Sequence, residues 1–281
     1  MIKRFELING RNEEYDLLTI AKSPTFQVEG FGYSDDTEFM RVGNNFVPLE
    51  ELSEQRTVEF TMLVWQSVDA TYKEFVSFAR HNPLIMLYEN DNGIFYYPCR
   101  LGSISKIEKV GIDIKGVPVT LKITGNPYKI VSDYNAGDVG TGKSYGETGY
   151  TYDYTYSAGI LNTVELRSDS YLESPCVLTL FGELTNPIWR HYLNGTLVET
   201  GAYTGTIPAG NYIVVDSKSV PYSVIEYDSA GHVVGDRYQL CDFSTERFMH
   251  IGEGQNSYVV SHDNLSPASL KAEAYIEYET I

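Results

Sequence analysis

The chain has 281 residues, of which 42% are hydrophobic and 21% charged, so it is long enough for one or two globular domains with a substantial core. Its 21 basic and 38 acidic residues give a net charge of −17, which disfavours a sequence-reading nucleic-acid binder and an anionic membrane face. The three cysteines lie far apart, without zinc or redox spacing. No apolar run has signal-peptide length or approaches the roughly 20 residues of a membrane span, so we expect a cytoplasmic protein unless it leaves the cell within something larger.

The first part of the chain is predicted to be mostly strands. Residues 57–65 (TVEFTMLVW) alternate between apolar and polar side chains, which is typical of a half-buried strand. Residues 84–89 and 94–100 flank the turn sequence NDNG at 90–93, which predicts a hairpin. Residues 117–123 form one more predicted strand.

One helix is predicted, beginning at a capping Ser67 or Asp69 and stopped by Pro83. The apolar residues repeat at helical spacing, and they are Tyr72, Phe75, Val76 and Ala79. One helix among more than a dozen strands indicates a mainly β protein with that helix packed on one sheet.

Two segments interrupt the strands. Residues 33–55 read as an irregular excursion that leaves the first domain. Residues 131–158 are rich in Gly, Tyr, Ser, Thr and Asp, and we interpret them as a linker. The domains are therefore expected at 1–130 and 159–281. The second domain ends in an alternating strand whose apolar face carries Leu270, Ala272, Ala274, Ile276 and Tyr278.

The stretch GDVGTGKSYG at 137–146 fits both a phosphate-binding loop and a G-x-S-x-G nucleophile elbow around Lys143 and Ser144. Both sites need a buried strand before the loop and a helix after it. The flanking sequences, SDYNA and YGETGYTYDYTYS, provide neither. We therefore expect no nucleotide site and no serine nucleophile here. The five histidines show no metal-ligand spacing, so we predict no catalytic residues, no cofactor and no metal.

Several blocks, taken in order, resemble phage distal tail proteins of the siphovirus-type tail component family. The first-domain blocks are KSPTFQVEGFGY, RTVEFTMLVW, VDATYKEFVSFARHN, PLIMLYEN and IFYYPCRLGSISKIEK. The second-domain blocks are YLESPCVLTLFGELTNPIWRHY, GTIPAGNYIVVDSK and YQLCDFSTERFMHIGEGQNSYVV. The resemblance covers nearly the whole chain, although no single block is diagnostic.

The resemblance implies a split β-barrel with one helix, followed by a galectin-like (jelly-roll) β-sandwich. It implies a structural protein without catalysis, forming a homo-hexameric ring between the tail tube protein and the baseplate hub or tail-associated protein. The sandwich would offer attachment for receptor-binding proteins. DNA would pass through the lumen without specific binding, and the protein would be assembled in the host cytoplasm and reside in the virion tail tip. The excursion at 33–55 would lie across the next subunit as a belt.

Two other functions stay open. A carbohydrate-binding module acting in host adsorption would need an exposed aromatic and polar side chains, and the residues that could supply them are Trp189, Arg190, His191, Glu246 and Arg247. A core position for Trp189 competes with that role, and the galectin sugar motif as a whole is not present. A hydrolase in the second domain is the other alternative, but no residue set indicates one.

Overall fold

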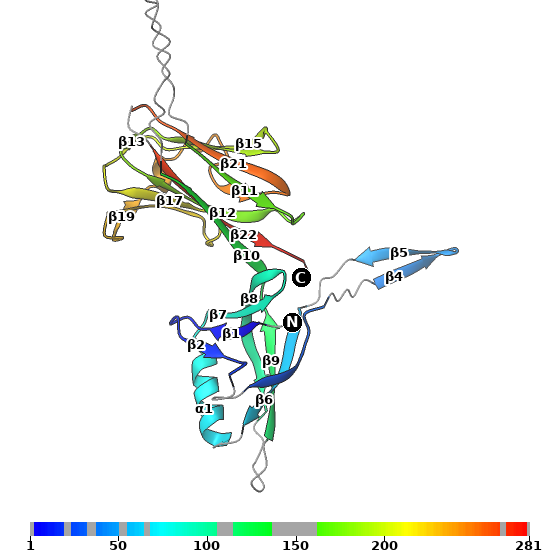
Figure 1. Cartoon of the computed structure of the whole chain (residues 1–281). Coiled ribbons are helices and arrows are strands. Elements are labelled where there is room, and N and C mark those ends of the chain that lie inside the picture. The colour runs from blue at the N-terminus through cyan, green and yellow to red at the C-terminus, as the bar shows by residue number, and fades with distance from the viewer. Residues whose placement is uncertain are drawn as a thin grey trace, which may run out of the picture. The chain divides into compact units, whose positions relative to one another are not determined.

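A computed structural model describes residues 3–19, 24–32, 38–50, 55–64, 68–105, 115–136, 162–264 and 268–279. The chain forms two compact units, one made of residues 1–129 with 278–281 and the other of residues 130–277 (Figure 1). Strands dominate both units, which confirms the mainly β fold class. The GDVGTGKSYG stretch lies outside the described residues, so our expectation for it stays a prediction.

The first unit is built around a curved antiparallel sheet. Hydrogen-bonded neighbours follow the path β3-β6-β9-β8-β7-β1-β2, which is not closed into a barrel within the described ranges. The elements are β1 (Arg4–Ile8), β2 (Glu14–Asp16), β3 (Thr25–Glu29), β4 (Glu38–Val42), β5 (Asn45–Glu50), β6 (Thr57–Val64), α1 (Val68–Ala79), β7 (Leu84–Asn90), β8 (Gly93–Ile104) and β9 (Lys115–Ile123).

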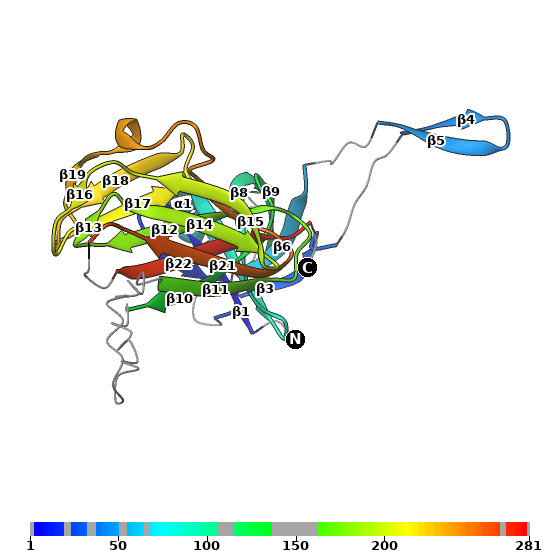
Figure 2. The ribbon, with the colours of Figure 1, turned by 90° about the horizontal axis from the view of Figure 1, so that it is seen from above.

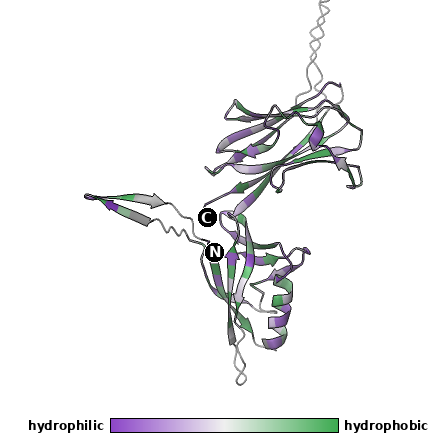
Figure 3. Ribbon diagram, turned by 180° about the vertical axis from the view of Figure 1, so that it is seen from behind, coloured by the Kyte–Doolittle hydropathy of each residue, from purple (hydrophilic) through white to green (hydrophobic). Residues whose placement is uncertain are grey.

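The alternation seen in the sequence sets which side chains form the core. Along β6 every second residue is buried, so Val58, Phe60, Met62 and Val64 face inward as predicted. The hairpin predicted around NDNG is formed by β7 and β8, which pair from Leu84–Cys99 to Asn90–Gly93. Figure 3 shows the same alternation of hydrophobic and hydrophilic residues along the strands.

Helix α1 covers part of this core. The rings of Phe75 and Phe78 contact Tyr15 of β2 edge-on or tilted, with centroids 5.2 and 5.4 Å away. The helix ends at Ala79, before Pro83, and the Asn9 side-chain amide donates a 3.2 Å hydrogen bond to the carbonyl of Phe78, one of the last acceptors of the helix. The helix prediction is confirmed, with an earlier end.

The excursion at 33–55 is not irregular throughout, which corrects our expectation. Strands β4 and β5 pair in register from Met40–Val47 to Val42–Asn45, and form a separate two-stranded ribbon (Figure 1). The two residues between them, Gly43 and Asn44, make a tight turn in which Gly43 has a φ of +65°. The acidic and amide residues around these short strands hide their alternation in the sequence.

The second unit is a sandwich of two antiparallel sheets. One has the order β19-β18-β17-β12-β22-β10, with β20 also paired to β12, and the other has the order β11-β21-β14-β15. Figures 1 and 2 show these sheets as two layers. The strands are β10 (Tyr128–Asn135), β11 (Asn162–Ser168), β12 (Ser174–Phe181), β13 (Leu184–Thr185), β14 (Ile188–Leu193), β15 (Thr196–Ala202), β16 (Thr206–Ile207), β17 (Tyr212–Asp216), β18 (Ser223–Tyr227), β19 (Val233–Asp236), β20 (Met249–Ile251), β21 (Gly254–Ser261) and β22 (Ser269–Glu277), with a 3-10 turn η1 (Tyr238–Leu240).

The chain passes between the units twice. Strand β10 begins in the first unit and continues into the second, so residues 131–135 of the expected linker are strand. Residues 137–161 lie outside the described ranges, and the linker there stays a prediction. The final strand β22 alternates as predicted and pairs with β12. Residues 278–281 belong to the first unit, where the Tyr278 ring lies 5.8 Å from that of Phe95.

The cysteines Cys99, Cys176 and Cys241 are buried free thiols. Burial raises the pKa of Cys176 to about 12 and that of Cys241 to about 11, so both are protonated at neutral pH. No helix within the described ranges is long and apolar enough to cross a membrane.

Candidate functional site

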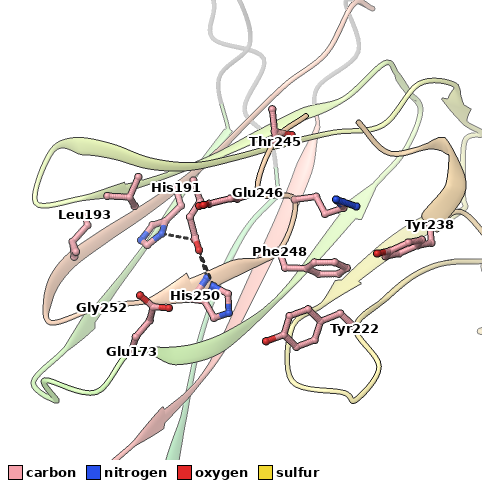
Figure 4. Close-up of a pocket in the computed structure, with 13 residues that line it drawn as sticks. Glu173, His191, Leu193, Tyr222, Tyr238, Thr245, Glu246, Phe248, His250 and Gly252 are labelled. Carbon is pink, nitrogen blue, oxygen red and sulfur yellow. Dashed lines mark hydrogen bonds and ion pairs between the residues drawn. The ribbon is translucent and has the colours of Figure 1, made fainter. Parts of the chain in front are cut away.

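A cavity of about 680 Å³ opens in the second unit and is lined by residues from both sheets. Strands β14 and β15 contribute His191 and Glu199 from one sheet, and β20 contributes His250 from the other. The loop between η1 and β20 adds Glu246 and Arg247. Figure 4 shows the rings of Tyr222, Tyr238 and Phe248 together at one end, and Glu173 with the two histidines at the other.

The carboxylate of Glu199 binds both histidines. Its Oε2 lies 2.9 Å from Nδ1 of His191, and its Oε1 lies 2.7 Å from Nδ1 of His250. The main-chain N–H of His250 adds a third bond to Oε2, at 2.9 Å. Glu199 reaches His191 because the two residues are direct partners in the β14–β15 ladder and therefore share a sheet face.

Asn256 fixes the ring of His191 from the other side. Its Nδ2 donates to the carbonyls of Gly252 and Gly254, at 2.9 and 3.1 Å, so its Oδ1 must be the acceptor for the Gly252 N–H and for Nε2 of His191, 2.9 Å away. The His191 ring also stacks on Tyr258, with centroids 4.7 Å apart. His191 is thus a buried, fully bonded part of the wall.

These contacts set the electrostatics of the cavity. Burial raises the pKa of the Glu199 carboxyl, but the hydrogen bonds from His191 and His250 outweigh it and hold the pKa at about 2. The hydrogen bond to Glu199 raises the pKa of His250 above its ordinary 6.5, against the opposing effect of burial. Glu199 is therefore ionised at neutral pH and favours a protonated His250.

Arg247 is the second polar feature of the cavity. Its guanidinium carbon lies 4.2 Å from the ring centroid of Phe243 and 5.4 Å from that of Tyr238. Its Nε and Nη1 are buried and have no hydrogen-bond partner in the described part of the chain. A guanidinium with unpaired buried donors is uncommon in folded proteins, and such donors are satisfied by an acceptor such as a water molecule or a ligand.

The structure separates the five predicted sugar-site residues. His191, Glu246 and Arg247 line the cavity, and Glu246 is exposed there. Trp189 is completely buried, and Arg190 points to the opposite face of β14, where Nη1 donates to Oγ of Ser261 at 3.0 Å. Neither residue lines the cavity, so neither belongs to the candidate site.

Three important residues of the cavity were missed. Tyr222, Glu199 and His250 come from segments far apart in the chain; Glu199 and His250 alone are 51 residues apart. No pattern in the sequence joins His191 to Glu199, because their pairing follows from the register of β14 and β15. No group of three or more metal-ligating side chains occurs among the residues that the structure describes.

Part of the chain matches one family model, and the whole chain is similar in fold to solved phage tail structures. Residues 4–122 match the family model "Distal tail protein, N-terminal domain". No curated protein sequence matches the chain. A chain of the phage P2 baseplate in its activated conformation with calcium has a TM-score of 0.67 and 17% identity, covering all of both chains. The SPP1 Dit (gp 19.1) protein has a TM-score of 0.61 and 10% identity, covering 96% of this chain and 98% of that one.

Proposed function

We propose, from the match of residues 4–122 to the distal tail protein N-terminal domain, that the whole chain is a structural part of a phage tail tip. The observation that carries the proposal is this domain match together with a shared fold along the full length of a phage P2 baseplate chain and of SPP1 Dit. We infer that the protein resides in the virion after assembly in the host cytoplasm, and that it has no catalytic role.

The first domain is proposed to build a homo-hexameric ring that joins the tail tube to the baseplate hub. The hairpin β4–β5 supports this role because its apolar side chains are exposed: Met40, Val42, Phe46 and Val47 have exposed fractions of 48, 52, 68 and 45%. Such a surface is stabilised when a neighbouring subunit covers it. A head-to-tail contact of this kind closes into a ring.

The second domain is proposed to hold peripheral proteins such as receptor-binding proteins. Its edge strands support this proposal, because β15 exposes Leu197 and Val198 and β19 exposes Val233 and Val234. An exposed edge that carries apolar side chains is a ready site for another chain. The charge of −17 on each copy suits a lumen through which DNA passes without being bound.

Negative-stain imaging and sedimentation of the purified protein test the ring. We expect six-fold rings, formed alone at high concentration or with the tail tube protein. The variant Val42→Ser/Phe46→Ser/Val47→Ser should stay a folded monomer, whereas Val220→Ser, at an exposed second-domain residue, should assemble normally. Normal assembly of the triple variant, or of a deletion of residues 35–52, would refute the belt. Absence of rings with every partner would refute the ring itself.

A further inference from the structure

We propose that the cavity around Arg247 and His250 is a binding site for a neutral saccharide, held between the two sheets of the second domain. The site goes beyond the proposed ring function and does not depend on it. It also differs from our initial set of sugar-site residues, because Trp189 and Arg190 take no part in it.

The polar groups of the cavity include both donors and acceptors. Arg247 contributes a guanidinium whose Nε and Nη1 have no hydrogen-bond partner among the described residues, and His250 contributes a side chain that is 24% exposed, with Nδ1 bound to Glu199. Glu173 and Glu246 are exposed carboxylates that line the same cavity and accept hydrogen bonds. Each hydroxyl of a sugar both donates and accepts, so such a mixed set can satisfy several neighbouring hydroxyls.

An aromatic wall lies beside these polar groups. Tyr222 and Phe248 have ring centroids 4.8 Å apart, and the centroid of Tyr238 is 6.1 Å from that of Phe248. Tyr222 is 45% exposed, so one side of its ring is open to a ligand (Figure 4). A pyranose ring has an apolar face of C–H groups that an exposed aromatic can cover, while its hydroxyls bind the polar side.

The Glu199 network holds the site in place before any ligand arrives. Glu199 fixes Nδ1 and the main-chain N–H of His250 in one orientation, and the carbonyl of His250 accepts a 2.6 Å bond from the hydroxyl of Tyr258. A side chain that is already ordered loses little rotamer entropy on binding, which favours affinity.

The charges of the cavity argue against ionic ligands. Charges of both signs line the cavity, because Arg247 lies there together with the carboxylates of Glu173, Glu199 and Glu246, so an ionic ligand of either sign would meet a like charge. An uncharged ligand with many hydroxyls meets neither penalty. We therefore expect the cavity to bind a neutral saccharide in preference to a phosphorylated or uronic-acid glycan.

The test uses the full chain on an array of neutral, uronic-acid and phosphorylated glycans, followed by calorimetry with the free sugars that bind. We expect neutral sugars to bind with dissociation constants of about 1 mM or tighter. Tyr222→Ala and Arg247→Gln should each weaken binding at least about tenfold, while Tyr222→Phe, which keeps the ring, should retain it. Tyr171→Ala is the matched control, because Tyr171 is 64% exposed and does not line the cavity.

Melting curves and ring assembly are recorded for each variant, so that loss of fold is separated from loss of the site. The proposal is overturned if no neutral sugar binds the folded protein at about 10 mM, if only acidic glycans bind, or if binding survives both Tyr222→Ala and Arg247→Gln. The proposal is also overturned if the cavity residues bind a protein partner and no sugar. None of these results bears on the hexameric ring, whose own test is separate.

Discussion

The indole Nε1 of Trp189 donates a 2.8 Å hydrogen bond to the main-chain oxygen of Arg247. The bond joins strand β14 to the loop that carries Arg247 into the cavity. It also explains why this tryptophan is buried rather than open to a sugar, since its only polar atom is already paired inside the sandwich.

Trp189→Phe removes this donor and leaves the Arg247 carbonyl without its partner. We expect a loss of about 1–3 kcal/mol in the free energy of unfolding of the second domain, the usual cost of an unpaired buried polar group. Chemical denaturation of the fragment 130–277 measures it. Tyr134→Phe, at a side chain that is 55% exposed, is the control and should change stability by less than about 0.5 kcal/mol. Equal effects of the two changes would contradict the role given to the bond.

Gly201 is the partner of Trp189 in the β14–β15 ladder, and a Cβ at this position would lie 2.3 Å from the indole nitrogen. Gly201→Ala should therefore force Trp189 aside and destabilise the second domain by about 1–3 kcal/mol. Gly235→Ala is a matched change in the edge strand β19, where the nearest atom is 3.5 Å away, and it should be tolerated. A Gly201→Ala variant as stable as Gly235→Ala would show that the tryptophan is not tightly packed.

The histidine–glutamate contacts predict a pH window for stability. Glu199 has a lowered pKa of about 2, so its contribution is present above its ordinary pKa of 4.5 and is lost as the pH falls toward 2. His250 has a raised pKa, so its contribution is complete below its ordinary pKa of 6.5 and is lost as the pH rises through the folded value. The difference in melting temperature between the wild type and Glu199→Gln should thus be largest between pH 4.5 and 6.5.

The control for this pH profile is Asp228→Asn. Asp228 also binds a histidine, His232, at 3.2 Å, but this pair lies on the surface, with exposed side-chain fractions of 40 and 80%. The Oδ1 of Asp228 also accepts the main-chain N–H groups of Ala230 and His232, bonds that an asparagine amide oxygen can keep, so the change should affect the melting temperature much less than Glu199→Gln does. A profile for Glu199→Gln as flat as that of Asp228→Asn would contradict the coupling.

The second domain should be expressed from residue 130 rather than from 159. A fragment beginning at 159 lacks β10, whose Asn135 side chain donates to Thr163 O at 2.9 Å. It also lacks Ala136, the residue after β10, whose carbonyl accepts from Ser269 Oγ at 2.8 Å. We expect the fragment 130–277 to melt at a higher temperature than 159–277 and to sediment as a monomer. Identical melting curves would show that β10 contributes nothing to the sandwich.

Tyr278 belongs to the first unit, where its main-chain N–H donates to Pro127 O at 2.8 Å and the Lys129 ammonium lies 5.2 Å from its ring centroid. Tyr278→Ala should lower the stability of the first unit by about 1–2 kcal/mol and leave the second unchanged. Calorimetry that resolves two transitions tests this, with the fragment 130–277 identifying the second. A shift of the second transition alone would contradict the assignment.

Local patterns in the sequence predicted those elements in which one face is buried along the whole strand. The alternation of residues 57–64 and 270–276 predicted β6 and β22, and NDNG predicted the β7–β8 hairpin. The β4–β5 hairpin was missed because the acidic and amide residues around its short strands hide their alternation. The resemblance predicted phage distal tail proteins, and residues 4–122 match the model of the N-terminal domain of that family.

The cavity could be predicted only in part. Glu246 and Arg247 were found because they are neighbours in the chain, and His191 because it follows a tryptophan. The residues that organise the cavity, Glu199 and His250, meet only through the register of two sheets. Trp189 and Arg190 do not line this cavity, and a sequence does not reveal which face of a strand is covered by a second sheet.

The two passages of the chain between the units also make the first unit discontinuous in sequence. The second unit, residues 130–277, is inserted between residue 129 and Tyr278, whose ring lies beside that of Phe95 in the first unit. The second unit is therefore connected to the first at both of its ends, and a single proteolytic cut in one connection leaves the other in place.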